Sequence, residues 1–462
     1  MKIRVKNLGA LKQAEFSLGD LTIICGGNNT GKTYATYALF GFLYTWRRLF
    51  SIEIQTDKIE QLLAEGVVRL DIKEYAEQAN QIIDRGCEDY TQELPSIFAS
   101  QDDRFKGTEF NIILETIDIP LLSKVDRKIG SGASRLFAIT KDEASSELVV
   151  TLLVENKKLK IPSEIIADTI ASAIKEIIFA QFLPRPFIAS AERTGAAIFR
   201  KELNFARNRL LDDLGQADKN FDPMELLLKD YQDYALPIKA NVDFTRQLES
   251  IEKKKSFITK EYPDILDSFA NIIGGNYTVT KKDELYYIPK NSHGTRLTMD
   301  ESSSAVRSLL DIGFYLKHEA RFGDLLMIDE PELNLHPENQ RRVARLIARL
   351  VNIGIKVFIT THSDYIIKEL NTLIMLNHDK PHLERIAEEE GYQKEELIAA
   401  EQIKVYVAEE AQILIDGNSR KTRCQTLILA NIDPEMGIDA YSFDTAIETM
   451  NRIQSAIVWS ED

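Results

Sequence analysis

The sequence has few cysteines, no long apolar run and no excess of basic residues. Its three cysteines, Cys25, Cys87 and Cys424, are too scattered to predict a disulfide framework or a metal cluster. No apolar run approaches the roughly 18 residues that a membrane-spanning helix requires. Lys and Arg number 57 against 72 Asp and Glu, so the formal net charge is −15. This acidic balance argues against a protein that binds nucleic acid over its whole surface. It does not exclude binding of nucleic acid by a local basic groove.

The N-terminus also lacks an apolar signal core, because residues 1–6 enter a strand-like alternation at once. Together with the scarcity of cysteine, this predicts a cytoplasmic protein without membrane contact. Hydrophobic residues make up 44% of the chain and charged residues 28%, which is typical of a folded globular protein. At about 150 residues per domain, the 462 residues allow about three domains, or one large fold with insertions.

Hydrophobic periodicity divides the chain into expected strands and helices. We expect strands within residues 2–24 and at 110–114, 136–140, 148–154, 187–190, 325–328 and 356–360, with a hairpin over 276–289. We expect helices over 32–50, 52–97, 163–182 (capped by Ser163), 303–318 and 337–353, and a broken helical stretch over 194–273. Beyond residue 370 the pattern indicates a tail of short alternating elements.

A glycine-rich segment lies between the first buried strand and the first helix. Residues 26–33, Gly-Gly-Asn-Asn-Thr-Gly-Lys-Thr, fit the pattern G-x-x-x-x-G-K-[ST]. In such a loop the glycines let backbone N–H groups surround a triphosphate, the lysine reaches the β- and γ-phosphates, and the hydroxyl ligates Mg²⁺. We therefore predict a nucleotide site formed by Gly26, Gly27, Asn28, Asn29, Thr30, Gly31, Lys32 and Thr33, with Thr33 also a Mg²⁺ ligand.

Two later strands end in side chains that suit the same chemistry. Asp329 and Glu330 follow the apolar run 325–328, and His362 follows the strand predicted at 356–360. We predict that Asp329 holds Mg²⁺ and that Glu330 polarises the attacking water. Ligands of parallel sheets bind at the carboxyl ends of the strands, so we expect His362 to contact the γ-phosphate or that water.

These motifs together resemble an ABC-type ATPase head of the SMC-like branch, close to the OLD-type ATPases. In this resemblance residues 26–33 are the Walker A motif, 325–330 the Walker B motif, 331–337 the D-loop segment, and His362 the switch histidine. The resemblance implies that the cofactors are ATP and Mg²⁺. It also implies an α/β P-loop NTPase fold with a mixed sheet, flanking helices, an antiparallel β-subdomain and an inserted helical region.

Two weaker matches accompany these motifs. Residues 302–309 resemble the signature motif, with Ala305 in place of the usual glycine, and this implies that Ser303 and Ser304 bind the γ-phosphate of a partner's ATP. An ordinary Ser-capped helix is the alternative. Residues 187–195 resemble a Pro-Ala-Glu-Arg-like segment in which Ser190 replaces the proline, and the roles of its Glu192 and Arg193 stay open.

The motif positions predict a divided chain. The expected parts are a discontinuous head (1–50 and 270–370), a helical insertion (51–108), an antiparallel β-subdomain with the return to the head (109–193), a helical lever (194–269) and a small C-terminal subdomain (371–462). The insertion contains helix breakers and strands and lacks sustained heptads, so it is not expected to form a long SMC-type coiled coil.

The resemblance also implies partners. In this family a complete site forms between two heads, which implies an ATP-dependent homo-oligomer, a dimer at least. OLD-type nucleases carry a Toprim domain whose metal site needs an Asp-x-Asp, and residues 371–462 contain none. The chain therefore resembles the ATPase subunits of the antiphage systems Septu and PARIS, which implies a separate effector, a nuclease or toxin. An SMC-like ATPase of DNA repair or recombination, and an ATP-gated scaffold with little turnover, are the alternatives.

A basic stripe occurs on one predicted helix. Arg341, Arg345 and Arg349 are spaced by four residues, with Arg342 beside them. Such a stripe suits a local contact with DNA or with an acidic partner. Because Glu338 precedes Arg342 by four residues, pairing on a solvated helix face is the favoured explanation.

Overall fold

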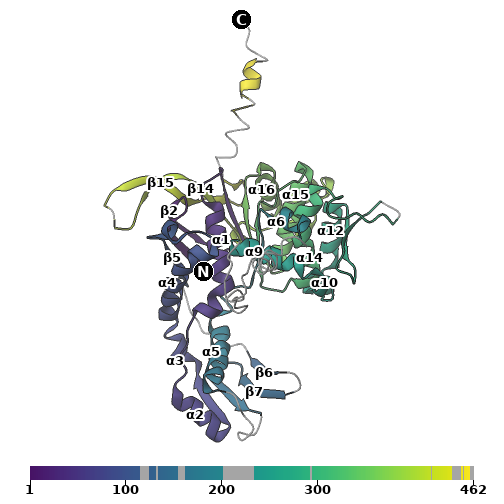
Figure 1. Cartoon of the computed structure of the whole chain (residues 1–462). Helices are drawn as coiled ribbons and strands as arrows, with labels where there is room; N and C mark the ends of the chain where they lie inside the picture. The colour runs from purple at the N-terminus through teal and green to yellow at the C-terminus, as the bar shows by residue number, and fades with distance from the viewer. Residues whose placement is uncertain are drawn as a thin grey trace, which may run out of the picture. The chain divides into compact units, whose positions relative to one another are not determined.

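The computed structural model describes residues 1–114, 124–131, 134–153, 162–200, 234–291, 294–417, 419–439, 449–450 and 452–457. The chain divides into two compact units, whose elements are labelled in Figure 1. Unit 1 consists of Met1–Arg4, Phe42–Glu93 and Glu109–Pro184, and unit 2 of Val5–Gly41, Leu94–Thr108 and Arg185–Asp462.

Unit 2 is built on a six-stranded mixed sheet in the order β15-β14-β3-β13-β12-β9. Its strands are β3 (Leu21–Gly26), β9 (Pro186–Ala189), β12 (Leu325–Asp329), β13 (Lys356–Thr361), β14 (Ile403–Leu414) and β15 (Lys421–Leu429). Neighbouring strands from β14 to β9 are parallel, and β15 is antiparallel to β14. Every residue of β3 and β12 is buried, as expected for parallel strands that are covered on both faces.

Helices and smaller strand pairs complete unit 2. The helices are α1 (Lys32–Leu49, whose second half belongs to unit 1), α6 (Arg193–Ile198), α9 (Leu236–Arg246), α10 (Leu248–Ile251), α11 (Phe257–Glu261), α12 (Pro263–Ile273), α13 (Ser304–Ser308), α14 (Leu310–Phe314), a π-helical turn at Tyr315–Glu319, α15 (Pro337–Asn352), α16 (Asp364–Leu376) and α17 (Pro381–Glu389). Short 3₁₀ turns occur at Asp102–Phe105, Lys394–Glu396 and Ala400–Gln402. The remaining strands are β1 (Lys2–Leu8, which begins in unit 1), β2 (Leu11–Ser17), the antiparallel pair β10 (Gly275–Val279) and β11 (Leu285–Pro289), and the pair β16 (Ile432–Asp433) and β17 (Gly437–Ile438).

One hydrophobic core holds the sheet and its helices together. The side chains of Ile23, Ile328 and Ile359 from the central strands pack in the same cluster as Ile347 of α15 and Ile366 of α16. Helices α15 and α16 lie side by side (Figure 1). The core therefore fixes the helices that follow the carboxyl ends of β12 and β13, which is where the predicted site residues lie.

Unit 1 contains a four-stranded antiparallel sheet in the order β4-β8-β7-β6. Its elements are α2 (Thr56–Glu65), β4 (Val67–Asp71), α3 (Ile72–Ala76), α4 (Ala79–Ile97, whose last turn belongs to unit 2), β5 (Glu109–Ile113), β6 (Val125–Ser131), β7 (Ser134–Lys141), β8 (Glu147–Leu152) and α5 (Ser163–Phe179). Aromatic side chains fill its core, with ring centroids 4.8 Å apart for Phe50 and Phe179 and 5.3 Å apart for Phe42 and Phe110.

The predicted fold class is confirmed: the chain is α/β, with a mixed sheet, flanking helices and a separate antiparallel sheet. The strand–loop–helix at the N-terminus and the strands β12 and β13 lie within a few residues of their predicted positions. The prediction missed β4 and β6, and for residues beyond 370, where β14 to β17 lie, it gave only short alternating elements. Strand β4 interrupts the stretch 52–97 that was expected to be helical, because Val68 and Leu70 are buried between exposed neighbours at the period of a half-buried strand. Strand β6 was not predicted either. Ser163 is the first residue of α5, whereas it was expected to be the N-cap.

Two strands of the C-terminal stretch join the central sheet. Residues 371–462 were expected to form a small subdomain, whereas β14 pairs in parallel with β3 from Ile403 opposite Leu21 to Ala408 opposite Gly26. Strands β14 and β15 of this stretch therefore belong to the central sheet of unit 2, and the expected boundary at residue 371 stays a prediction. Of the expected helical lever at 194–269, residues 201–233 lie outside the described residues, and the rest forms most of α6, then α9, α10, α11 and the first part of α12.

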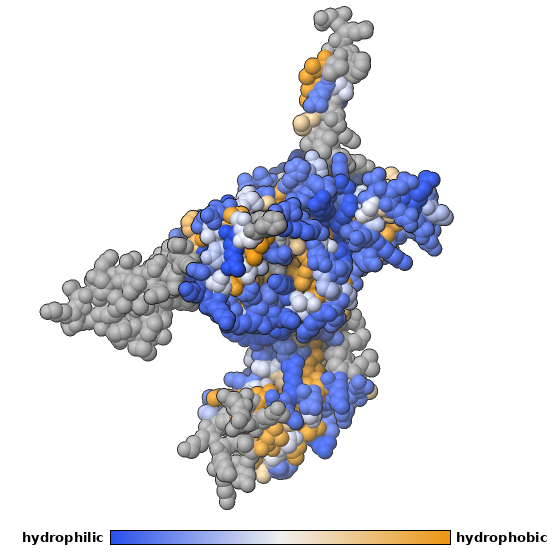
Figure 2. Space-filling model, turned by 90° about the vertical axis from the view of Figure 1, so that its right-hand side faces the viewer, coloured by the Kyte–Doolittle hydropathy of each residue, from blue (hydrophilic) through white to orange (hydrophobic). Residues whose placement is uncertain are grey.

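No helix among the described residues is both long and apolar enough to cross a membrane. On the face seen in Figure 2, hydrophilic side chains cover most of the described surface, and apolar ones occur in small groups.

Candidate active site

The loop of residues 26–33 connects β3 to α1, as predicted. Gly26 has a φ of +134° and Gly31 a φ of +95°, in the region that favours glycine. A Cβ atom on Gly26 would lie 2.5 Å from the carbonyl oxygen of Ala408 in β14. Asn28 and Asn29 are exposed. The backbone shape thus requires the two glycines, while the outer residues of the loop are open to a ligand.

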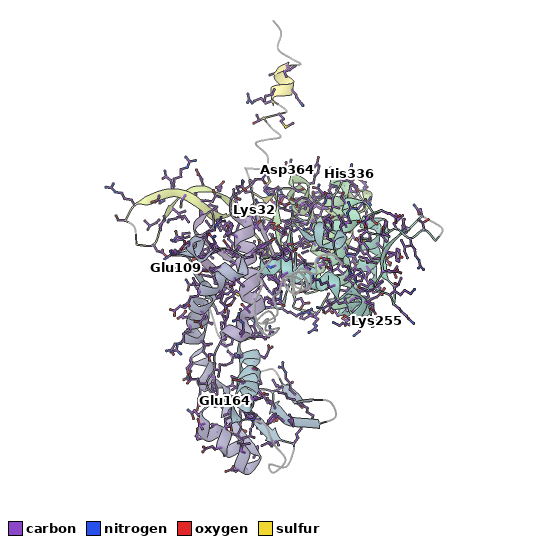
Figure 3. The ribbon with its side chains drawn as sticks, in the orientation of Figure 1. Lys32, Glu109, Glu164, Lys255, His336 and Asp364 are labelled. Carbon is purple, nitrogen blue, oxygen red and sulfur yellow. The ribbon has the colours of Figure 1, made fainter. Side chains whose placement is uncertain are left out.

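Lys32, labelled in Figure 3, begins α1 and is 6% exposed. Its Nζ donates hydrogen bonds to the carbonyl oxygens of Gly27 (2.6 Å) and Gly26 (3.2 Å). Burial lowers the pKa of Lys32, whereas the negative charges of Glu330 and Asp329 favour its protonated form. The lysine therefore presents a cation at the loop, close to two carboxylates.

Strand register brings the predicted residues to one edge of the sheet. In the pairing of β12 with β13, Asp329 lies opposite Thr360, and in the pairing of β13 with β3, Thr361 lies opposite Cys25. The carboxyl ends of these three strands are therefore level, and the loop at 26–33, Glu330 and His362 all follow them directly. This is the edge at which ligands of parallel sheets bind.

Glu330 and His362 contact each other at this edge. The Nε2 of His362 lies 3.5 Å from the Oε1 of Glu330. The hydrogen bond from His362 lowers the pKa of Glu330, and the positive charges of Lys32 and Arg193 act in the same direction, although burial opposes them. Glu330 is consequently held as a carboxylate that is able to accept a proton from water.

Asp329 fits the predicted Mg²⁺ ligand. It is 2% exposed, and its Oδ1 accepts a hydrogen bond from the hydroxyl of Thr360. Its buried Oδ2 has no hydrogen-bond partner among the described residues. Burial raises the pKa of Asp329 to about 6. Thr33 is exposed in the first turn of α1, so its hydroxyl is accessible. A carboxylate oxygen and an accessible hydroxyl are the hard oxygen donors that Mg²⁺ prefers.

Glu332 was not singled out from the sequence as a site residue. Its Oε1 accepts a 2.7 Å hydrogen bond from the backbone N–H of His362, and its buried Oε2 has no partner among the described residues. Burial raises the pKa of Glu332. Glu332 therefore holds the segment that carries His362. Its only sequence signal is a second carboxylate shortly after Glu330, which is too common a pattern to identify it.

The predicted signature serines lie at the start of a short helix. Ser303 is the N-cap of α13, and its Oγ accepts a 3.3 Å hydrogen bond from the N–H of Val306. Ser304 is the first residue of that helix. Helix α13 packs on α6. Within one chain Ser303 is thus a helix cap, and binding of a partner's ATP by Ser303 and Ser304 stays a prediction.

The segment after β9 contacts both the first helix and the end of β12. The Oε2 of Glu192 accepts a 2.9 Å hydrogen bond from the hydroxyl of Tyr37, one turn beyond Thr33 in α1. Arg193 is buried and donates to the backbone carbonyls of Asp329 and Glu330. The site thus includes a residue whose role the sequence left open.

The basic stripe of α15 is paired within unit 2. Arg341 and Arg345 both donate to the buried carboxylate of Glu369, at 2.7 and 2.5 Å. Arg342 pairs with Glu338, and Arg349 with Asp264. The Arg342–Glu338 pair lies within α15, as the favoured explanation has it, whereas Glu369 lies in α16 and Asp264 in α12. Intramolecular ion pairs thus account for the stripe, partly within the helix and partly between helices.

Comparison with known protein families gives one match, to a model described as "AAA ATPase domain", over residues 1–367. No curated protein matches the chain. The matched range includes the loop at 26–33, Asp329, Glu330 and His362, and it ends within α16, so that β14 and β15 lie outside it.

Among solved structures the chain is distantly similar to SMC heads. An SMC head bound to the C-terminal winged-helix domain of ScpA is 12% identical, with 92% of this chain and 97% of that chain covered and a TM-score of 0.31. The SMC head domain from Thermotoga maritima is 8% identical, with 93% and 98% covered and a TM-score of 0.30. An SMC head from Pyrococcus furiosus, with an extended coiled coil and bound to the C-terminal domain of ScpA, is 13% identical, with 98% of each chain covered and a TM-score of 0.30.

Proposed function

The chain belongs to the family of AAA ATPase domains, and from this premise we propose that it binds ATP with Mg²⁺ at residues 26–33 and hydrolyses it with Glu330 as the general base. The observation that carries the proposal is the contact of His362 with Glu330 at the sheet edge where the loop begins. A nucleotide-binding loop alone would suit a binding protein, but a carboxylate kept ionised beside it suits hydrolysis.

Each residue has a distinct part in the reaction. Lys32 offsets negative charge on the β- and γ-phosphates, and the backbone N–H groups of the loop hold them. Glu330 accepts a proton from water as the water oxygen bonds to the γ-phosphorus and the bond to the β–γ bridging oxygen breaks. His362 keeps Glu330 ionised and oriented. Asp329 and Thr33 would hold Mg²⁺, which neutralises phosphate charge when bound.

The wider role is an ATP-dependent dimer, or a larger homo-oligomer, that controls a separate effector. The motif resemblance to the ATPase subunits of Septu and PARIS supports an antiphage role, with a nuclease or toxin as the effector. Of the alternatives, an SMC-like role in DNA repair receives little support from α15, whose arginines pair with Glu369, Glu338 and Asp264. An ATP-gated scaffold with little turnover is favoured by Ala305 in α13, where a glycine would let a phosphate approach more closely.

Two measurements on the full chain test the ATPase. Phosphate release in the presence of ATP and Mg²⁺ tests hydrolysis, and Lys32→Ala is expected to abolish both release and ATP binding. If the wild type binds ATP but releases no phosphate, the proposed ATPase activity is overturned in favour of the ATP-gated scaffold. Absence of binding would overturn both.

The partners are tested on the native complex. Purification from cells that carry the neighbouring genes is expected to recover the chain as an oligomer together with an effector, and mass measurement gives the stoichiometry. A monomer with ATP, even for Glu330→Gln, would contradict the dimer. Tight, salt-sensitive binding of DNA ends by the isolated chain would favour the repair role instead.

A further inference from the structure

We propose that Arg193 is a positioning residue for hydrolysis, which fixes the backbone of Glu330 and ties it to the end of α13. This inference rests on the proposed ATPase function. Among the hydrogen bonds of the described residues, Arg193 has none to the loop at 26–33 or to the side chain of Glu330. It acts through the peptide groups on either side of the general base.

Arg193 is buried and makes several hydrogen bonds. It is 1% exposed, and its guanidinium donates to four backbone carbonyls. Nη1 donates to Ser190 (2.8 Å) and Asp329 (2.6 Å), Nη2 donates to Glu330 (2.8 Å), and Nε donates to Ser308 (2.6 Å). The four carbonyls belong to three separate segments, which are the ends of β9, of β12 and of α13. One planar side chain therefore joins them in a fixed geometry.

The backbone of Glu330 needs such support. Its φ is +53°, a left-handed conformation that is uncommon for a residue with a side chain. Its N–H donates to the carbonyl and to the hydroxyl of Thr360, at 3.1 and 3.2 Å. Its carbonyl accepts from Arg193. Thr360 thus fixes the N–H of Glu330 and Arg193 fixes its carbonyl. With both backbone groups fixed, the carboxylate is oriented toward His362. Loss of either support would let the backbone relax and misplace the general base.

The carboxylates around Arg193 favour its charged form against the effect of burial. Burial disfavours the charged guanidinium, and the carboxylate of Asp311 in α14 is the main charge that favours it. Asp311 is itself buried, and neither of its oxygens has a hydrogen-bond partner among the described residues. It therefore balances the charge of Arg193 without competing for the N–H groups that hold Glu330.

A second buried arginine provides a matched control. Arg200 is 6% exposed and also lies in unit 2, where it donates to the carbonyls of Thr245 (2.6 Å) and Asp283 and pairs with the Asp283 carboxylate. It has no hydrogen bond to the end of β12 among those of the described residues. Arg200→Lys and Arg193→Lys both keep a buried positive charge and replace the planar guanidinium by a single ammonium group. The two substitutions are therefore chemically the same and differ only in where they lie.

The experiment compares ATP binding with turnover in the full chain. Arg193→Lys is expected to lower kcat by about 10- to 100-fold while the Kd for ATP with Mg²⁺ changes less than about threefold. Arg200→Lys is expected to keep the wild-type kcat. Arg193→Lys combined with Glu330→Gln is expected to hydrolyse ATP no more slowly than Glu330→Gln alone, because Arg193 acts through Glu330.

The opposite results would overturn the proposal. A folded Arg193→Lys protein with wild-type kcat, or a loss equal to that of Arg200→Lys, would remove the positioning role. If Arg193→Lys does not fold, Arg193→Gln keeps an amide donor without a buried charge, and the same split between kcat and Kd is expected. If Arg193→Lys and Arg193→Gln both unfold while Arg200→Lys and Arg200→Gln fold, Arg193 is a folding residue only. No hydrolysis by the wild type would overturn the proposed function itself, which is a distinct outcome.

Discussion

His362 approaches Glu330 with its Nε2 3.5 Å from the carboxylate Oε1, while its own backbone N–H donates to Glu332. The histidine is therefore fixed by one carboxylate and acts on another. Since its hydrogen bond lowers the pKa of Glu330, it widens the pH range in which the general base is ionised.

Removing the histidine should shift the pH profile of hydrolysis. In His362→Ala the pKa of Glu330 is expected to rise, so activity is lost at a higher pH as the solution is acidified. The measurement is kcat against pH for both proteins, with His382→Ala, an exposed residue of α17, as the control. An acidic limb that stays in place would contradict the role of His362, even if the rate itself falls.

Replacing the general base should separate binding from turnover. Glu330→Gln keeps the size of the side chain and removes its ability to take a proton, so kcat is expected to fall by at least ~100-fold. ATP binding is expected to persist, and the ATP-bound oligomer to accumulate. Phosphate release and mass measurement in the same solution check both. Normal hydrolysis by Glu330→Gln would show that another group is the base.

The sequence places the candidate residues in the right elements where its signals are local, and their roles in the reaction stay predictions. The glycines and Lys32 of residues 26–33 lie in one short segment, and the positive φ values of Gly26 and Gly31 follow from the loop shape that the motif encodes. Asp329, Glu330 and His362 could be grouped because the ends of parallel strands meet at one edge. These inferences need only the order of residues along a strand and its direction.

Other features carry no comparable signal. Arg193 donates to backbone carbonyls, which every residue possesses, so no partner residue type marks its role. Glu369 neutralises Arg341 and Arg345 from a different helix, and the spacing within α15 cannot reveal it. The membership of β14 in the central sheet depends on a pairing with β3 that is distant in sequence.

Asp311 should make stability depend on pH. Burial raises its pKa to about 7, and the positive charge of Arg193 opposes this. The folded state therefore binds the proton more tightly than the unfolded state. This contribution to stability is fully present at low pH and is lost as the pH rises from about 4 towards 7.

Asp311→Asn removes that ionisation. The difference in unfolding free energy between variant and wild type is expected to change by roughly 3 kcal/mol, in favour of the variant, when the pH is raised from 5 to 8. Denaturant unfolding at both pH values measures the difference, and Asp267→Asn, an exposed carboxylate in α12, is the control. A stability difference between variant and wild type that is the same at both pH values would contradict the ionisation of Asp311 in the folded state.

The tightest backbone approach in the loop gives the last test. In Gly26→Ala the new Cβ would lie 2.5 Å from the carbonyl oxygen of Ala408 at a φ of +134°. Both the clash and the strain are unfavourable, so we expect a loss of about 2–4 kcal/mol in unfolding free energy together with weaker ATP binding. Gly195→Ala in α6 meets nothing within 4 Å and should raise stability by up to about 1 kcal/mol, since alanine favours a helix. If Gly26→Ala were as stable as Gly195→Ala, β14 could not be packed against the loop as closely as the structure has it.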